Sequence, residues 1–87
     1  MNQSILFPDI QVWDEEQQQV RFPVQQGGAL IECVISLSRL QQISSRSLVT
    51  ENDALDAFSH ARFDIEDWVE GLIEDEEFNQ HGQVDLG

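Results

Sequence analysis

Residues 20–35 read VRFPVQQGGALIECVI, and this stretch decides the fold. Apolar and polar side chains alternate on both sides of Gly27 and Gly28, which is typical of two half-buried strands joined by a tight turn. With the two glycines as the whole turn, three apolar pairs face each other across the strands: Val24 with Ile31, Phe22 with Cys33, and Val20 with Ile35. A shift of one residue would destroy all three matches, so the sequence predicts the hairpin and its register.

A further strand is predicted before the hairpin, because Ile10 and Val12 alternate with Gln11 and Trp13. A three-residue loop over 15–17 gives its register as two apolar pairs: Val12 opposite Val20, and Ile10 opposite Phe22. Pro23 has no N–H group, and in this register the missing donor points toward the first strand. We therefore expect the pairing between these two strands to stop near Asp9.

The second half of the sequence predicts helices. Ser36 is a candidate N-cap for a short helix, whose inward residues are expected to be Leu37, Leu40 and Ile43. Thr50 and Asp53 resemble a capping box at the start of one long amphipathic helix over residues 51–76, with a weak point near Arg62. Its apolar positions recur at spacings of three and four: Leu55, Phe58, Ala61, Ile65, Trp68 or Val69, and Leu72.

These elements predict a two-layer α+β fold in a single domain over residues 1–87. The sheet is antiparallel with three or four strands, the hairpins come first, and Val84 and Leu86 form a last short edge strand. The short helix and the long amphipathic helix pack on one face of this sheet. The hairpin residues Val20, Phe22, Val24, Ile31, Cys33 and Ile35 are then expected to be buried against Leu55, Phe58, Ile65, Trp68 and Leu72.

The charge of the chain bears on its partners. Its 87 residues include 17 acidic and four basic residues, all four arginine, for a formal net charge of −13. Nucleic acids and anionic membranes attract cationic surfaces, so we expect no direct contact with DNA or RNA and no membrane binding. The balance favours a protein partner with a basic surface, or no charged partner at all.

Motifs for catalysis and targeting are missing. The sequence has no glycine-rich phosphate loop, no Cys or His pair at zinc spacing and no Ser-His-Asp set, so it calls for no cofactor and leans away from an enzyme. Cys33 is the one cysteine, which rules out an internal disulfide. Met1 to Leu6 lacks the basic start and apolar run of a signal peptide, so we expect a cytoplasmic protein.

Several short patterns along the chain resemble a known family. They are Phe7-Pro8-Asp9, Trp13, Val20-Arg21-Phe22, Ile31-Glu32-Cys33 leading into Ile35-Ser36, and Ala57-Phe58 with Arg62 to Ile65. The chain is similar in these patterns to a small uncharacterised bacterial family, the domain of unknown function 1488. The resemblance implies a compact α+β domain and no activity, cofactor or catalytic residue. Some members of that family are labelled as candidate transcriptional regulators.

Two groups of residues are candidates for chemistry. Cys33 is expected in the core opposite Phe22, where a thiol is a small hydrophobe rather than a nucleophile. Asp56, His60 and Asp64 share one side of the long helix, and carboxylates with an imidazole are ligands for a divalent ion. However, residues eight apart lie about 12 Å apart along a helix, so one ion could take only two of them. We read them as a solvated face and as weak metal candidates.

Two further sets are candidates for binding. Glu74, Asp75, Glu76 and Glu77 form an acidic run at the helix end, which is either a solubilising end or a docking patch for a basic partner. Trp13, Leu30 and Val34 are expected on the sheet face opposite the core stripe. That much apolar surface needs a cover, either from the short helix and the tail or from a second copy of the chain.

Three functions follow from these observations. The leading one is a non-enzymatic protein-interaction module, with a homodimer through the second sheet face as one form of it. The second is a small metal- or ligand-binding protein or enzyme that uses helix carboxylates with His60. The third is a regulator that acts on transcription through protein partners.

Overall fold

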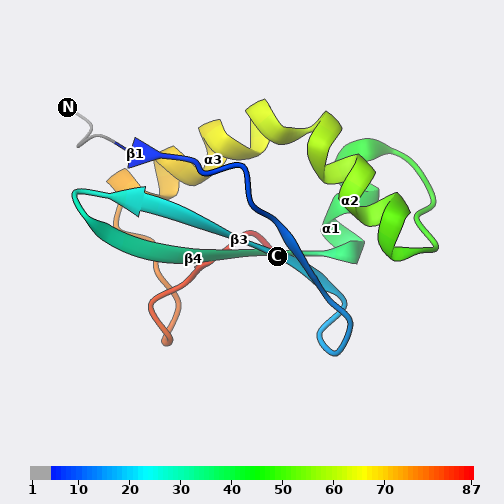
Figure 1. Ribbon diagram of the computed structural model, residues 1–87, viewed down its shortest axis with the longest axis horizontal. Helices are drawn as coiled ribbons and strands as arrows, with labels where there is room; N and C mark the ends of the chain where they lie inside the picture. Colours follow the sequence, from blue (N-terminus) through cyan, green and yellow to red (C-terminus); the bar gives the residue numbers. More distant parts are fainter. Residues whose placement is uncertain (1–4) are drawn as a thin grey trace.

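The computed structural model describes residues 5–87, which form a sheet with helices packed on one of its faces (Figure 1). The elements follow in the order β1 (Ile5–Leu6), β2 (Val12–Asp14), β3 (Gln19–Gln26), β4 (Ala29–Ser36), α1 (Leu37–Ser44), α2 (Glu51–His60), α3 (Arg62–Glu74) and β5 (Val84–Asp85). The α+β class and the two layers are as predicted. The sheet has five strands, and β5 pairs with β4 in parallel, so it is larger than expected and mixed.

The β3–β4 hairpin has the predicted register. Val24 pairs with Ile31, Phe22 with Cys33, and Val20 with Ile35. Gly27 and Gly28 both have positive φ angles, 54° and 90°, the backbone that a two-residue hairpin turn requires and that glycine adopts without strain. The prediction from matched apolar pairs is therefore confirmed.

The register predicted for the first strand is wrong by one residue. Trp13 pairs with Val20 and Val12 pairs with Arg21, because the loop before β3 has four residues rather than three. Gln18 makes this possible by taking a left-handed backbone with a φ of 53°. Since side chains alternate along a strand, the shift moves Trp13 to the helix-covered face and Val12 to the other face. Trp13 accordingly packs against the core.

Pro23 interrupts the outer edge of β3. β1 pairs with Gln25 and Gln26, and β2 pairs with residues 19–21, so both short strands flank the proline without pairing to it. In a hairpin closed by a two-residue turn, the amides of alternate residues face the outer edge, and Pro23 falls on such a position with no N–H to donate. The expected stop in pairing is present, and β1 resumes it beyond the gap.

Arg62 fastens the segment that leaves the sheet at this gap. Its guanidinium donates to the carbonyl oxygen of Pro8 at 2.7 Å and to the side-chain oxygen of Gln11 at 2.9 Å. Glu66, one turn further along α3, accepts a third hydrogen bond at 2.9 Å. The guanidinium carbon lies 5.6 Å from the ring centre of Phe58, so the same side chain also packs on the core.

The predicted helix caps are present. The hydroxyl of Ser36 accepts a hydrogen bond from the N–H of Arg39 at the start of α1. Thr50 and Asp53 form a complete capping box at the start of α2. These polar side chains satisfy N–H groups that have no partner within the helix.

The long helix is two helices, which corrects the prediction. The chain breaks at Ala61, with φ −98° and ψ 11°, one residue before the expected weak point. The break changes which residues face the sheet, so α3 buries Ile65, Val69 and Ile73. Trp68 was expected in the core, yet its side chain is 36% exposed and covers the guanidinium of Arg39.

The core otherwise follows the hairpin stripe. It contains Val20, Phe22, Val24, Cys33, Ile35, Leu40, Leu48, Ala54, Ala57, Phe58, Ile65, Val69, Ile73, Val84 and Leu86, and it is bordered by the half-buried Ile31, Leu55 and Leu72. Ile43 was expected to point inward, but it is 42% exposed because α1 ends one residue later. Among residues 5–87, no helix is long and apolar enough to cross a bilayer.

Candidate interaction surface

The face of the sheet away from the helices, here called the open face, carries alternate residues of each strand. By the observed pairing these are Leu6, Val12, Asp14, Gln19, Arg21, Pro23, Gln25, Leu30, Glu32, Val34 and Asp85. All helices of residues 5–87 lie on the opposite side of the sheet (Figure 1). The open face is therefore the one sheet surface available to a partner.

The half of the open face nearer the hairpin turn is apolar. Leu6 and Leu30 lie on either side of Gln25 and are 57% and 72% exposed. A hollow of about 370 Å³ opens between Val12, Pro23 and Leu30. An apolar side chain placed in this hollow would remove these exposed surfaces from water, which is favourable.

Arg21 lies at the centre of the open face. Its guanidinium is 3.6 Å from Asp14 and 3.5 Å from Glu32, one carboxylate on each neighbouring strand. The same side chain borders the apolar hollow and a second hollow of about 440 Å³ on its other side. The two hollows are therefore neighbours on the open face, and together we call them the open-face groove.

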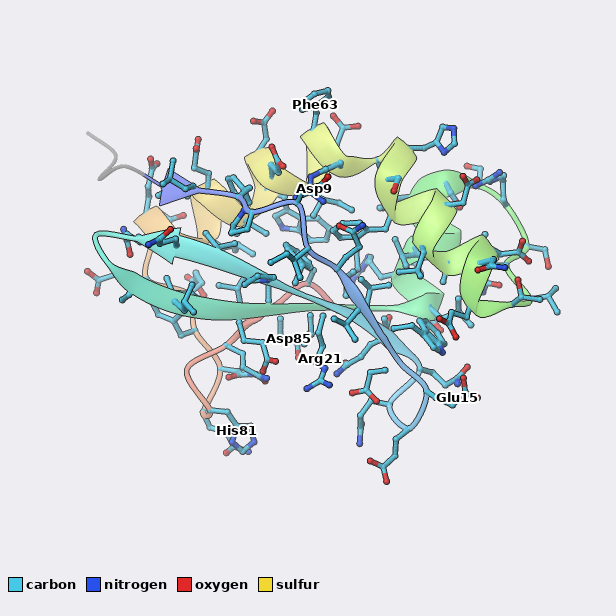
Figure 2. All side chains as sticks on the ribbon, viewed as in Figure 1. Asp9, Glu15, Arg21, Phe63, His81 and Asp85 are labelled. Carbon is cyan, nitrogen blue, oxygen red and sulfur yellow. The ribbon has the colours of Figure 1, made fainter. Side chains whose placement is uncertain are left out.

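Two loops wall the second hollow. One is the loop over 15–18 and the other is the segment over 79–83, and both project beyond the sheet on its open side (Figure 1). In Figure 2, Arg21 and Asp85 point into the space between them, with Glu15 on one loop and His81 at the tip of the other. The lining comes from both loops and the sheet: Asp14, Gln17, Gln19, Arg21, Val34, Asn79, His81, Gln83 and Asp85.

A short polar side chain fixes each wall. The carboxylate of Asp14 accepts a hydrogen bond from the main-chain N–H of Gln17 at 3.0 Å. The side-chain oxygen of Asn79 accepts from the N–H groups of His81 and Gln83 at 2.9 Å and 2.8 Å. Asp and Asn commonly order turns in this way. The walls are held in place without a partner, which lowers the ordering cost of binding.

The structure separates the residues predicted to bind a partner. Leu30 and Val34 do lie on the open face, although Val34 is only 4% exposed because the walls enclose it. Trp13 does not belong to this surface, since the register shift places it against the core. It donates its indole N–H to Glu15.

The acidic run Glu74, Asp75, Glu76 and Glu77 closes α3 and leads into one wall of the groove. The N–H of Glu77 bonds the carbonyl of Leu72, and the N–H of Glu76 bonds that of Ile73, which is a Schellman helix ending. Glu76 takes the left-handed position of this motif with a φ of 58°. All four side chains are exposed.

The weak metal candidates form a surface cluster around Asp56. Its carboxylate lies 3.6 Å from His60 and 3.5 Å from Arg46, and these side chains are all more than half exposed. Asp64 lies on α3, beyond the break at Ala61. Within residues 5–87, no three His, Cys, Asp or Glu side chains come close enough to hold a metal ion. Asp56 therefore already has an arginine and a histidine as neighbours.

Cys33 is buried in the core, as its place in the hairpin predicts. Burial, together with the neighbouring carboxylate of Glu32, raises the pKa of its thiol to about 12. The thiol therefore stays protonated at neutral pH, and a protonated thiol is a poor nucleophile.

Sequence reasoning missed the groove because loops build half of it. Val12 and Leu6 were not recognised as open-face residues, and no interaction residue was predicted between residues 78 and 83. Asp14 and Asn79 are the signals that could have revealed the walls, since both residue types favour turns.

Comparison with known proteins places the chain among relatives. A family model described as "Protein of unknown function (DUF1488)" matches residues 5–86. The chain belongs to this family. The uncharacterised protein YrdB of Escherichia coli K12 is 34% identical over 84 residues, which cover 97% of this chain and 96% of that protein. YrdB of Shigella flexneri is 33% identical over the same lengths.

A solved member of the DUF1488 family has the same fold. The crystal structure of a family protein of unknown function from Shewanella loihica PV-4 superimposes with a TM-score of 0.94 at 36% sequence identity. The match covers 99% of this chain and 94% of the other. The family resemblance seen in the sequence is thus confirmed, and these relatives assign no activity to any residue.

Proposed function

We propose that this DUF1488 protein is a non-enzymatic, cytoplasmic protein-interaction module that binds a segment of a partner protein in the open-face groove. One observation carries the proposal: the sheet has helices on one face only, and its other face is a groove with an exposed apolar half. Exposed apolar surface bordered by polar groups is typical of binding sites. The buried, protonated thiol of Cys33 is compatible with a reducing compartment.

The two walls favour a narrow occupant. The loops over 15–18 and 79–83 extend past the sheet on the open side, so a second flat sheet would meet the loops before it reached Leu30 (Figure 1). A single strand, helix or extended segment fits between them. A homodimer through this face, with two sheets in contact, is therefore less favourable than a single bound segment.

Photo-crosslinking in living cells tests this function. A benzophenone amino acid at position 30 is compared with the same residue at Val49, which is 80% exposed in the loop between α1 and α2. We expect discrete adducts of higher mass from position 30 and none from position 49. An adduct of twice the protein's mass would assign the face to a second copy. No adduct from position 30, or the same adducts from both positions, would contradict the proposal.

A further inference from the structure

The open face carries more carboxylates than cations. The side chains of Asp14, Glu32 and Asp85 lie on it, by the observed pairing of their strands. Arg21 is the arginine that faces these groups, and its guanidinium already lies between Asp14 and Glu32. A strong negative potential therefore remains on this side of the sheet.

The other three arginines are engaged elsewhere and do not offset this potential. Arg39 donates to the carbonyl oxygen of Leu86 and lies over the ring of Trp68. Arg46 lies beside Asp56 on α2. Arg62 holds the segment before β2, as described above. Between exposed charges, attraction and repulsion act over about 8–10 Å at physiological salt, so the carboxylates of the open face act together on a charged group that enters the groove.

The negative charge of the open-face groove favours one kind of binding partner over the others. A second copy would bring the same carboxylates against one another, and a nucleic acid or an anionic membrane would be repelled in the same way. A cationic protein segment is attracted. The enclosed side chain of Val34 also lies on the floor between the walls, where it can contact the alkyl stem of a lysine or arginine while the charged head reaches Asp14 or Asp85.

The apolar half of the groove adds a second requirement. The hollow at Val12, Pro23 and Leu30 adjoins the walled hollow through Arg21, so one short segment spans both. We propose that the groove takes a protein segment in which a lysine or arginine lies close to a large apolar side chain. The proposal rests on the function given above and specifies the chemistry of its partner.

Selection from a displayed library of random dodecapeptides, with the full chain as bait, tests the proposal. We expect enriched peptides that combine basic residues with a large apolar residue and that lose binding to the Leu30→Glu variant.

The affinity of the selected peptides is then measured by fluorescence polarisation for the parent protein and for two double variants. Glu32→Gln with Asp85→Asn, the groove pair, removes two charges from the open face, and the amides can still accept the hydrogen bonds from Gln83 and from the N–H of Gly87. Asp64→Asn with Asp67→Asn removes two exposed charges from α3.

The comparison of the two double variants separates the effect of charges in the groove on peptide affinity from the effect of the overall negative charge. We expect the groove pair to weaken binding about three- to tenfold, as for two exposed ion pairs, and the α3 pair to change it less than about twofold. Equal losses from both pairs would reveal diffuse attraction and overturn the assignment. Peptides that depend on Leu30 but lack basic residues would also overturn it, while leaving the interaction surface in place. A selection without any peptide sensitive to Leu30→Glu would contradict the proposed function itself.

Discussion

The guanidinium of Arg62 donates a hydrogen bond of 2.7 Å to the main-chain carbonyl oxygen of Pro8, 54 residues earlier in the chain. This contact joins the helix layer to the segment between β1 and β2, which has left the sheet at Pro23. Arg62 and Pro8 both belong to the patterns through which the chain resembles its family. Their shared role is structural, because Arg62 is 20% exposed and its donors are used within the chain.

Replacing Arg62 with methionine should destabilise the fold. The variant keeps most of the apolar stem but loses the hydrogen bonds to Pro8, Gln11 and Glu66, and bonds to a charged group contribute about 1.5–3 kcal/mol. We expect a loss of about 2–3 kcal/mol in the free energy of unfolding, measured by urea denaturation. Arg46→Met is the control, because Arg46 makes one exposed contact and should matter by less than about 0.5 kcal/mol. Equal losses in the free energy of unfolding for the two variants would contradict a special structural role of Arg62.

Phe58 should be the most sensitive core position. Its side chain is 1% exposed, and its ring centre lies 4.9 Å from that of Phe22. Phe58→Ala leaves a cavity and should cost about 3–5 kcal/mol, a large part of the stability of so small a protein. Phe63 offers a matched comparison, since it is 83% exposed and points away from α3 (Figure 2). Thermal unfolding of Phe63→Ala should differ little from the parent protein, and a comparable loss at both positions would contradict this core.

Glu76→Gly should stabilise the protein. Glu76 has a left-handed backbone at the end of α3, which costs a residue with a Cβ atom more than glycine. We expect a gain of about 0.5–1 kcal/mol, visible as a higher melting temperature. Glu77→Gly removes the same charge next door without relieving a left-handed residue, so it should not reproduce the gain. A stabilisation of equal size in both variants would point to charge repulsion instead.

Lowering the pH should destabilise the N-terminus of α2, because it protonates the capping carboxylate of Asp53. Hydrogen bonds from the main-chain N–H groups of Val49 and Thr50 hold the pKa of Asp53 below its ordinary value. A carboxyl group whose pKa is lower in the folded protein contributes its full stabilisation above its pKa in the unfolded chain, which is about 3.9. This contribution is lost as the pH falls through the pKa of the folded protein. Asp53→Asn should therefore be less stable than the parent near pH 6, with a difference that shrinks in acid. A difference independent of pH would contradict this role.

Trp13 and Leu30 should respond differently to a charge. Trp13→Glu places a carboxylate on the helix-covered face and should destabilise the fold, because burying an unpaired charge is costly. Leu30→Glu changes a side chain that is 72% exposed and should leave the melting temperature almost unchanged. The opposite order in thermal unfolding would restore the register originally expected for β2.

The sequence predicts this fold wherever several residues agree on one geometry. Three matched apolar pairs fix the β3–β4 register, and the Thr50–Asp53 spacing locates the start of α2. The errors arise at single residues whose backbone is unusual for their type. Gln18 is left-handed although it is neither glycine nor asparagine, and Ala61 breaks a helix although alanine is the best helix former. In both places tertiary packing overrides the local preference.

The candidate site is less predictable than the fold. Leu30 and Val34 are assigned to the correct face by the hairpin register alone. Trp13 is not, because its face depends on the conformation of Gln18 in the preceding loop. The walled hollow brings residues 14–19 together with residues 79–85, and no periodic pattern links two segments so far apart in the sequence.

Pro23 has a consequence for association between unfolded or partly folded chains. A bare strand edge offers a row of donors and acceptors on which another chain can add a strand and begin to aggregate. Pro23 removes a donor from the middle of the outer edge of β3, and β1 and β2 occupy the two ends of that edge. An incoming strand therefore meets an interrupted ladder, and Arg62 keeps the chain beside that gap anchored to α3. On the β3 side, the sheet therefore presents no long uninterrupted edge to copies of itself, while its open face stays available to a partner.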